Sequence, residues 1–121
     1  MKKRVLVVED HEENRRILRL LLASASIDMI EAVTGEAGVA AAERDRPDLI
    51  LMDIQLPGLD GYEATRRIKA NPAVRHIPII VVTSYALSGD DVKAFEAGCD
   101  AYVTKPFVPR ELLAKVREFL A

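Results

Sequence analysis

The strongest constraint on the fold of this chain is a set of short apolar segments, each followed by polar residues. Four of these segments are clear and a fifth, at residues 29–30, is weaker; the clear ones cover residues 5–8, 49–52, 79–82 and 101–103. Runs of this length favour strands, and runs that are continuous rather than alternating are typical of strands buried on both faces. The pattern therefore predicts a parallel sheet covered by helices on both sides.

Helix-like segments alternate with these apolar runs along the chain. We expect helices at about residues 12–25, 34–45 with Thr34 as the cap, 62–70 and 90–97, and a last helix that begins at Pro109. Such alternation is the sequence sign of βα units around a parallel sheet. At 121 residues the chain suits one domain. We expect this domain to span residues 1–121 and no output domain to follow it.

Composition excludes several classes of protein. Half of the residues are hydrophobic and 30% are charged, which suits a soluble protein with an aliphatic core. The net charge is -2, and Arg15, Arg16 and Arg19 fall at helical spacings that predict a solvated face, so we expect no binding to nucleic acid. No apolar run is long enough for a membrane span or a signal peptide, which predicts a cytoplasmic protein without membrane contact. The lone Cys99 is expected to be an inert core thiol.

The polar residues that follow the apolar runs carry the candidate chemistry. Glu9 and Asp10 follow the first run, Asp53 follows the run at 49–52, and Thr83 and Lys105 follow or closely follow the last two. Because parallel sheets place their ligand sites beyond the carboxyl ends of the strands, we expect these side chains to meet. The three carboxylates would repel one another, and Mg²⁺ is the cation that best relieves this repulsion, since it takes oxygen ligands and bridges carboxylates to phosphoryl groups.

A carboxylate beside Mg²⁺ can attack phosphorus and form an aspartyl phosphate. The Lys105 ammonium and the Thr83 hydroxyl are suited to meet the negative charge on the phosphoryl oxygens. His11 is adjacent to the acidic pair, but a transition-metal site would need more than one imidazole or thiolate. We therefore interpret His11 as an exposed residue at a helix start.

Several motifs, in a specific order and spacing that covers the whole chain, resemble the receiver domain of bacterial two-component response regulators. They are Val5-Leu6-Val7-Val8-Glu9-Asp10, the run from Pro47 through Asp53 and Pro57 to Gly61, Val82-Thr83-Ser84 and Lys105-Pro106. Within this family the chain is most similar to the stand-alone DivK-like regulators of cell-cycle signalling. That finer similarity rests on the residues in segments 85–90 and 98–102. The receiver domains of hybrid kinases have much of the same sequence in these segments.

The resemblance implies a flavodoxin-like, doubly wound α/β fold, with a five-stranded parallel sheet in the order 2-1-3-4-5 and five helices. It implies that Asp53 accepts a phosphoryl group from a sensor histidine kinase or a histidine phosphotransferase. Asp10 and Asp53 would bind Mg²⁺ directly, Glu9 mainly through water, and Gln55 through its main-chain carbonyl. The signal would leave through a downstream protein effector. The chain would not be an enzyme in the usual sense, since it would catalyse only its own phosphotransfer and dephosphorylation.

The resemblance also assigns residues that respond to phosphorylation. Lys105 would contact the phosphoryl group, and its peptide bond to Pro106 would be cis. Thr83 and Tyr102 match the coupled switch pair of the family. The chain departs from the family at His11, where an amide or a carboxylate is common, and at Tyr85, which is expected to affect water access to the phosphoryl group.

Three other functions fit part of this pattern, and a fourth does not fit it. The chain can be a receiver domain excised from a hybrid histidine kinase, or an interaction module that no longer takes phosphate. A phosphatase of the haloacid-dehalogenase type also forms an aspartyl phosphate beside Mg²⁺, but it needs a second Asp where this chain has Gln55. A nucleotide-binding protein would need a glycine-rich loop after the first strand, where this chain has Glu9 and Asp10.

Overall fold

The computed structural model describes residues 2–84 and 90–121. Its strands form one parallel sheet in the order β2-β1-β3-β4-β5. The strands are β1 (Arg4–Val8), β2 (Asp28–Ala32), β3 (Leu49–Met52), β4 (Ile79–Thr83) and β5 (Ala101–Thr104). The helices are α1 (Glu12–Ser24), α2 (Gly35–Asp45), α3 (Gly61–Ala70), α4 (Asp90–Ala97) and α5 (Pro109–Leu120). The predicted flavodoxin-like order is confirmed.

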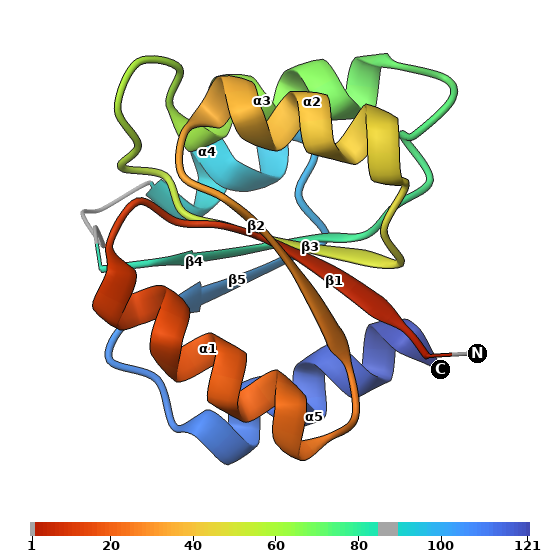
Figure 1. The fold of residues 1–121 in the computed structure, drawn as a ribbon. Helices are drawn as coiled ribbons and strands as arrows, with labels where there is room; N and C mark the ends of the chain where they lie inside the picture. The colour runs from red at the N-terminus through yellow and green to blue at the C-terminus, as the bar shows by residue number, and fades with distance from the viewer. Residues whose placement is uncertain (1, 85–89) are drawn as a thin grey trace.

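Helices cover both faces of the sheet, as Figure 1 shows. Helices α2, α3 and α4 lie on one face, and α1 and α5 lie on the other. Alternate residues of β1 feed the two cores: Leu6 and Val8 pack on the side of α2 to α4, whereas Val5 and Val7 pack on the side of α1 and α5. Burial on both faces explains why the strands read as continuous apolar runs.

The helix boundaries agree with the predicted ones to within about one residue. Thr34 caps α2 as expected, since its side chain accepts a hydrogen bond from the Ala37 N–H at 3.0 Å. Helix α3 begins one residue earlier than predicted, at Gly61, because the Asp60 side chain accepts from the Glu63 N–H at 2.9 Å and caps the helix there. Within the described ranges, no helix is both long and apolar enough to cross a membrane.

Cys99 lies in the core between the sheet and helices α2 to α4. Burial, helped by the charge of Asp100, raises the pKa of its thiol to about 11. Because the thiolate is the reactive form, a thiol with this pKa is inert at neutral pH. The predicted core position of Cys99 is therefore confirmed, and its low reactivity stays a prediction.

Candidate functional site

The hydrogen-bond ladder of the sheet continues past the strands and fixes the backbone of the candidate site. The Glu9 N–H donates to the Ala32 carbonyl of β2 at 3.0 Å, and the Asp53 N–H donates to the Val8 carbonyl of β1 at 3.0 Å. The Lys105 N–H donates to the Thr83 carbonyl of β4 at 2.8 Å. The neighbouring strand therefore anchors each of these three residues.

The alternation of side chains along a strand explains why these residues converge. Val7 of β1, Leu51 of β3 and Val103 of β5 all contribute to the core beneath α1 and α5. Side chains two positions apart on an extended chain share a face. Glu9, Asp53 and Lys105 each come two positions after one of these core residues. Their side chains are thus directed to the same side of the sheet.

The Lys105 ammonium joins two carboxylates in the crevice. Its Nζ atom lies 2.5 Å from Glu9 Oε1 and 3.2 Å from Asp53 Oδ2. The exposed fractions of the side chains are 14% for Lys105, 3% for Glu9 and 8% for Asp53. One ammonium cannot balance three neighbouring carboxylates, so the crevice keeps a negative charge with Asp10 beside it.

Burial raises the pKa of Glu9 above its ordinary value, and the negative charge of Asp53 adds to this increase. The hydrogen bond from Lys105 works in the opposite direction. Burial is the largest single influence on the pKa of this carboxyl. Burial and the neighbouring charge of Asp53 therefore both disfavour the ionised form of Glu9.

Asp10 carries an unsatisfied oxygen. Its Oδ1 atom is shielded from solvent and has no hydrogen-bond partner among the described residues, although His11 Nδ1 lies 3.2 Å away in a geometry that makes no hydrogen bond. Glu9, Asp10 and His11 offer ligand atoms that all lie within 4.8 Å of one another. A partnerless carboxylate oxygen in an oxygen-rich, negatively charged crevice fits a hard divalent cation.

His11 has a closer relation to the acidic pair than the sequence predicted. It is exposed and directly precedes α1, as expected. Its backbone N–H donates to Glu9 Oε2 at 3.2 Å, and its ring Nδ1 lies 3.3 Å from the same oxygen. The sequence contained no signal for this arrangement, because it depends on how the β1–α1 loop turns.

Gln55 and Gly61 shape the backbone around Asp53. The Gln55 N–H donates to Asp53 Oδ1 at 3.3 Å, so the main chain at Gln55 turns over this carboxylate. A Cβ atom at Gly61 would lie 2.0 Å from the Asp53 carbonyl oxygen. The start of α3 therefore packs directly against the backbone of Asp53, which only glycine permits.

The proposed switch residues lie on the other face of the sheet. Thr83 is fully buried at the end of β4. Tyr102 of β5 pairs with Val81 and is half-buried against the core that includes Ala94 of α4. Because Val81 and Thr83 are two residues apart, Thr83 and Tyr102 share the face that α4 covers. Tyr85, and with it residues 85–89, lies outside the described residues.

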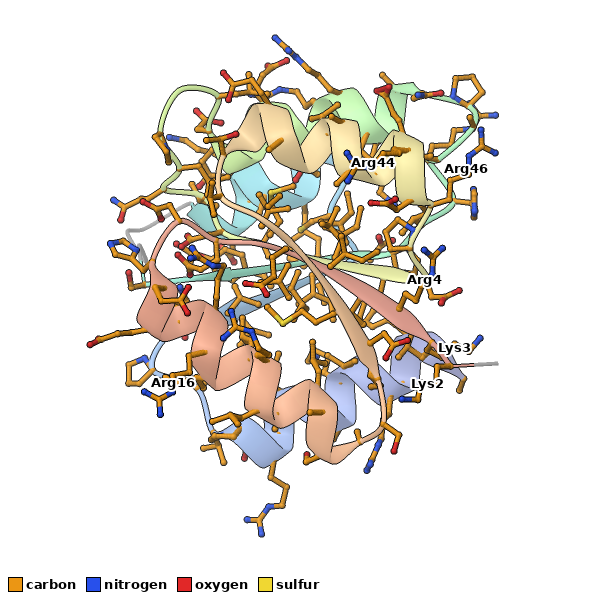
Figure 2. The ribbon with its side chains drawn as sticks, in the orientation of Figure 1. Lys2, Lys3, Arg4, Arg16, Arg44 and Arg46 are labelled. Atoms are coloured by element: carbon orange, nitrogen blue, oxygen red, sulfur yellow. The ribbon has the colours of Figure 1, made fainter. Side chains whose placement is uncertain are left out.

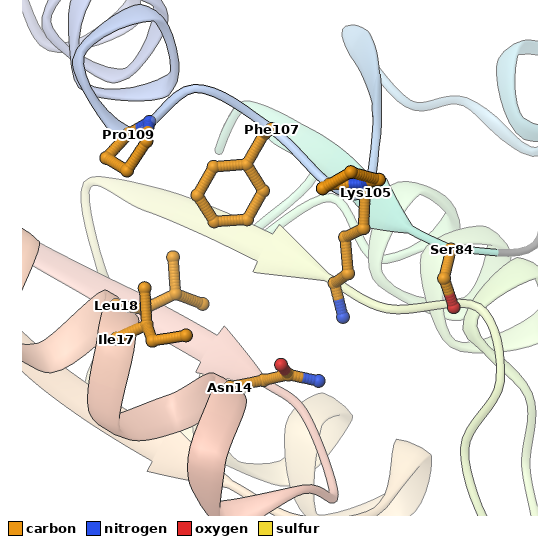
Figure 3. A pocket seen from close by; sticks show the side chains of 8 residues that line it. Asn14, Ile17, Leu18, Ser84, Lys105, Phe107 and Pro109 are labelled. Atoms are coloured by element: carbon orange, nitrogen blue, oxygen red, sulfur yellow. The ribbon is translucent and has the colours of Figure 1, made fainter.

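A pocket opens beside Lys105, between α1 and the loop that joins β5 to α5. It has a volume of about 440 Å³. Figure 3 shows the Lys105 side chain extending toward Asn14 of α1, with Phe107 from the same loop as Lys105 also facing the pocket. The residues that line the pocket are Asn14, Ile17, Leu18, Ser84, Lys105, Pro106, Phe107 and Pro109. The Lys105–Pro106 peptide bond is cis, as expected.

The prediction of a solvated arginine face was wrong for Arg15. Its side chain is 13% exposed, and its guanidinium donates to the Glu9 carbonyl at 3.0 Å. Arg16, one position later, is exposed and points away from the protein (Figure 2). The difference arises because Glu31 of β2 and the β1–α1 loop lie on the side of α1 that Arg15 faces.

Comparisons with known proteins agree with this geometry. Residues 5–117 match the family model of the response regulator receiver domain. The chain is 38% identical to the polar-differentiation response regulator DivK of Brucella anthropi over 120 residues, which cover 99% of this chain and 98% of that protein.

Solved structures give the same picture. One is the receiver domain of a sensor histidine kinase from Pseudomonas aeruginosa, solved with a magnesium ion coordinated in its active site cleft. The match has a TM-score of 0.92 and 38% sequence identity, and it covers 99% of this chain and 98% of the Pseudomonas chain. The BeF3-activated N-terminal receiver domain of RstA from Klebsiella pneumoniae has a TM-score of 0.88 and 28% identity, with 98% of each chain covered.

Proposed function

Since this chain belongs to the response regulator receiver domain family, we propose that it carries a signal as a phosphoryl group on Asp53. The observation that carries this proposal is the contact of Lys105 with Asp53 and Glu9 in a crevice at the carboxyl ends of the strands. Asp53 contacts the Lys105 ammonium, which also contacts Glu9 of the acidic pair and lines the pocket. The similarity to DivK over nearly the full length of both proteins supports a stand-alone regulator.

The transfer itself needs little from the protein beyond position and charge. An Asp53 carboxylate oxygen attacks the phosphorus of a phosphohistidine, the bond from phosphorus to the imidazole nitrogen breaks, and that nitrogen keeps the electron pair. The Lys105 ammonium, 3.2 Å from Asp53 Oδ2, lies where it can stabilise charge on the phosphoryl oxygens. The chain acts only on its own acceptor, so we class it as a signalling protein rather than an enzyme.

The residues present fit a magnesium ion. Asp10 and Asp53 would bind it directly, Glu9 mainly through water, and Gln55 through its main-chain carbonyl. The partnerless Asp10 Oδ1 supports this assignment. Burial is the main cause that raises the pKa of Glu9, and the negative charge of Asp53, which adds to this increase, is the part that a cation would offset. When bound, the ion supplies positive charge against the three carboxylates and the incoming phosphoryl group.

The proposed output runs through Thr83 and Tyr102 to the surface formed by α4, β5 and α5. Both residues lie on the face that α4 covers. Val92 and Phe95 of α4 are exposed, so this surface offers apolar area to a protein effector. A hydrogen bond from Thr83 to the phosphoryl group would bias this surface between two states.

The proposed donor surface is α1 with the β5–α5 loop. The pocket beside Lys105 opens there and is lined by the exposed Ile17 of α1. Leu20 of α1 and Val108 of the β5–α5 loop are also exposed. A histidine that projects from a sensor kinase or a histidine phosphotransferase could reach Asp53 from this side. We place both partners and this protein in the cytoplasm.

A receiver domain from a hybrid kinase is the second candidate. The 38% identity to the receiver domain of the Pseudomonas kinase equals the 38% identity to DivK, so identity does not separate the two. Both candidates share the acceptor and the crevice. They differ in whether the phosphoryl group passes to an effector or to another histidine.

The experiment is to treat the protein with acetyl phosphate and Mg²⁺ and to locate the modification by mass spectrometry. We expect one phosphoryl group per chain, on Asp53, and none in Asp53→Asn. Asp60→Asn is the matched control, because Asp60 is a nearby acid that caps α3 and lies outside the crevice. Undiminished labelling of Asp53→Asn would refute the assignment, and sustained turnover of small phosphate esters would favour the phosphatase.

A further inference from the structure

We infer that Arg15 is a positioning residue for the Mg²⁺ site, acting through the main-chain carbonyl between Glu9 and Asp10. This inference rests on the proposed function, since it concerns the same site. Arg15 touches neither Asp53 nor Lys105 in the contacts described above. Its proposed role is to hold the peptide from which both carboxylates of the acidic pair extend.

The contact geometry places Arg15 at a junction of three elements. Its Nη1 atom donates to the Glu9 carbonyl at 3.0 Å, its Nε atom to Glu31 Oε1 of β2 at 3.2 Å, and its Nη2 atom to Glu12 Oε2 of α1 at 2.5 Å. A guanidinium is planar and rigid, so several hydrogen bonds fix its orientation. The Glu9 carbonyl thereby gains a donor whose position β2 and α1 determine.

The backbone at Glu9 is held from both sides as a result. Its N–H donates to the Ala32 carbonyl of β2 at 3.0 Å, and its C=O accepts from Arg15. The Ala32 carbonyl therefore holds the peptide plane before Glu9, and Arg15 holds the one between Glu9 and Asp10. This matters because the Glu9 side chain must reach Lys105 while Asp10 keeps an oxygen without a partner.

Arg19 keeps Glu31 in place without touching the acidic pair. It donates to Glu31 Oε1 at 2.7 Å and to Glu31 Oε2 at 3.2 Å. The hydrogen bond from Arg19 is the main cause that lowers the pKa of Glu31, with Arg15 adding to it. Arg19 is thus a matched control, since it shares Glu31 and Glu12 with Arg15 but not the Glu9 carbonyl.

Two possible effects of Arg15, through its charge and through its hydrogen bond to the Glu9 carbonyl, predict opposite changes in Mg²⁺ affinity when Arg15 is replaced. Removing the positive charge of Arg15 near the acidic pair would strengthen the attraction between the site and Mg²⁺. Removing a positioning bond would weaken Mg²⁺ binding, and loss of such outer partners costs roughly tenfold or more in metal affinity. The sign of the change in affinity therefore separates the two explanations.

The experiment measures Mg²⁺ affinity by isothermal titration calorimetry for the parent, Arg15→Ala, Arg15→Gln and Arg19→Ala. Melting temperatures in EDTA establish that each variant is folded, and the glutamine variant keeps a polar helix-forming side chain should the alanine variant be unstable. We expect both Arg15 variants to bind Mg²⁺ about tenfold more weakly. Arg19→Ala is expected to stay within about twofold of the parent, because exposed ion pairs contribute little.

Two results would overturn the inference. Arg15 variants that bind Mg²⁺ as tightly as the parent, or more tightly, would show that the carbonyl contact does not position the site. An equal loss in Arg19→Ala would assign the effect to Glu31 instead. A parent protein that binds no Mg²⁺ would refute the magnesium site itself, which is a failure of the proposed function and is distinct from these two.

Discussion

Lys105→Met is the substitution that most directly tests the charge balance of the crevice. Methionine keeps the length of the lysine stem but removes the cation that contacts both Glu9 and Asp53. Both carboxylates are almost fully buried. Removing one partner from a buried ion pair costs about 3–5 kcal/mol, because the remaining charge has no compensation. That is a large part of the roughly 5–15 kcal/mol that stabilises a typical domain.

The expected loss depends on pH. Burial raises the pKa of Glu9 above 4.5 in the folded protein, and removing Lys105 raises it further. A carboxyl whose folded pKa exceeds its unfolded value binds more protons when folded, so stability falls as pH rises through that interval. The deficit of Lys105→Met should therefore be largest at neutral pH and shrink as the pH falls through the raised pKa of Glu9, where this carboxyl takes up a proton.

The assay is urea denaturation followed by circular dichroism, in EDTA, at pH 7 and pH 5. Lys93→Met is the control, since Lys93 is an exposed lysine on α4. In the double variant with Glu9→Gln, part of the lost stability should return, because one of the two uncompensated charges is gone. A loss below about 1 kcal/mol at pH 7, or a double variant without any recovery, would refute the proposed balance of charges.

Three further predictions concern the framework. Gly61→Ala should destabilise the protein by about 1–3 kcal/mol or more in urea denaturation, because the new Cβ would lie 2.0 Å from the Asp53 carbonyl oxygen; parent-like stability would contradict this. Cys99 should react slowly with a thiol reagent at pH 8 until the protein unfolds, since its pKa is raised to about 11; rapid labelling of the folded protein would count against it. Lys69→Met should cost about 1–3 kcal/mol, measured by the same denaturation, because Lys69 is mostly buried and binds Asp100 at 3.0 Å.

The fold was predictable because the relevant signals are local. The apolar run at residues 49–52 is short, continuous and bounded by polar residues, and it forms β3 within these limits. Pro109 is the first residue of α5, as its fixed backbone angle predicts. Asp53 and Lys105 were predictable for a related reason, since a residue that follows a parallel strand is placed by the sheet itself.

Arg15 and His11 were not predictable in the same way. Arg15, Arg16 and Arg19 look equivalent in sequence, because helical spacing says which residues share a face but not what lies opposite. The difference depends on Glu31 and on the carbonyl of Glu9, which are brought to α1 by tertiary structure. The ring of His11 likewise faces the acidic pair because of a loop conformation that no residue pattern specifies.

The distance along the chain between the partners of Lys105 has a consequence for synthesis. Lys105 lies 96 positions after Glu9 and 52 positions after Asp53. During synthesis, Asp53 is therefore made well before the lysine that contacts it. The crevice is completed only when β5 joins the sheet, so a truncated or half-made chain would carry Asp53 without its counter-charge. Under the proposed function, a chain that stops before β5 would therefore be a poor phosphoryl acceptor, even where Asp53 is already held against β1.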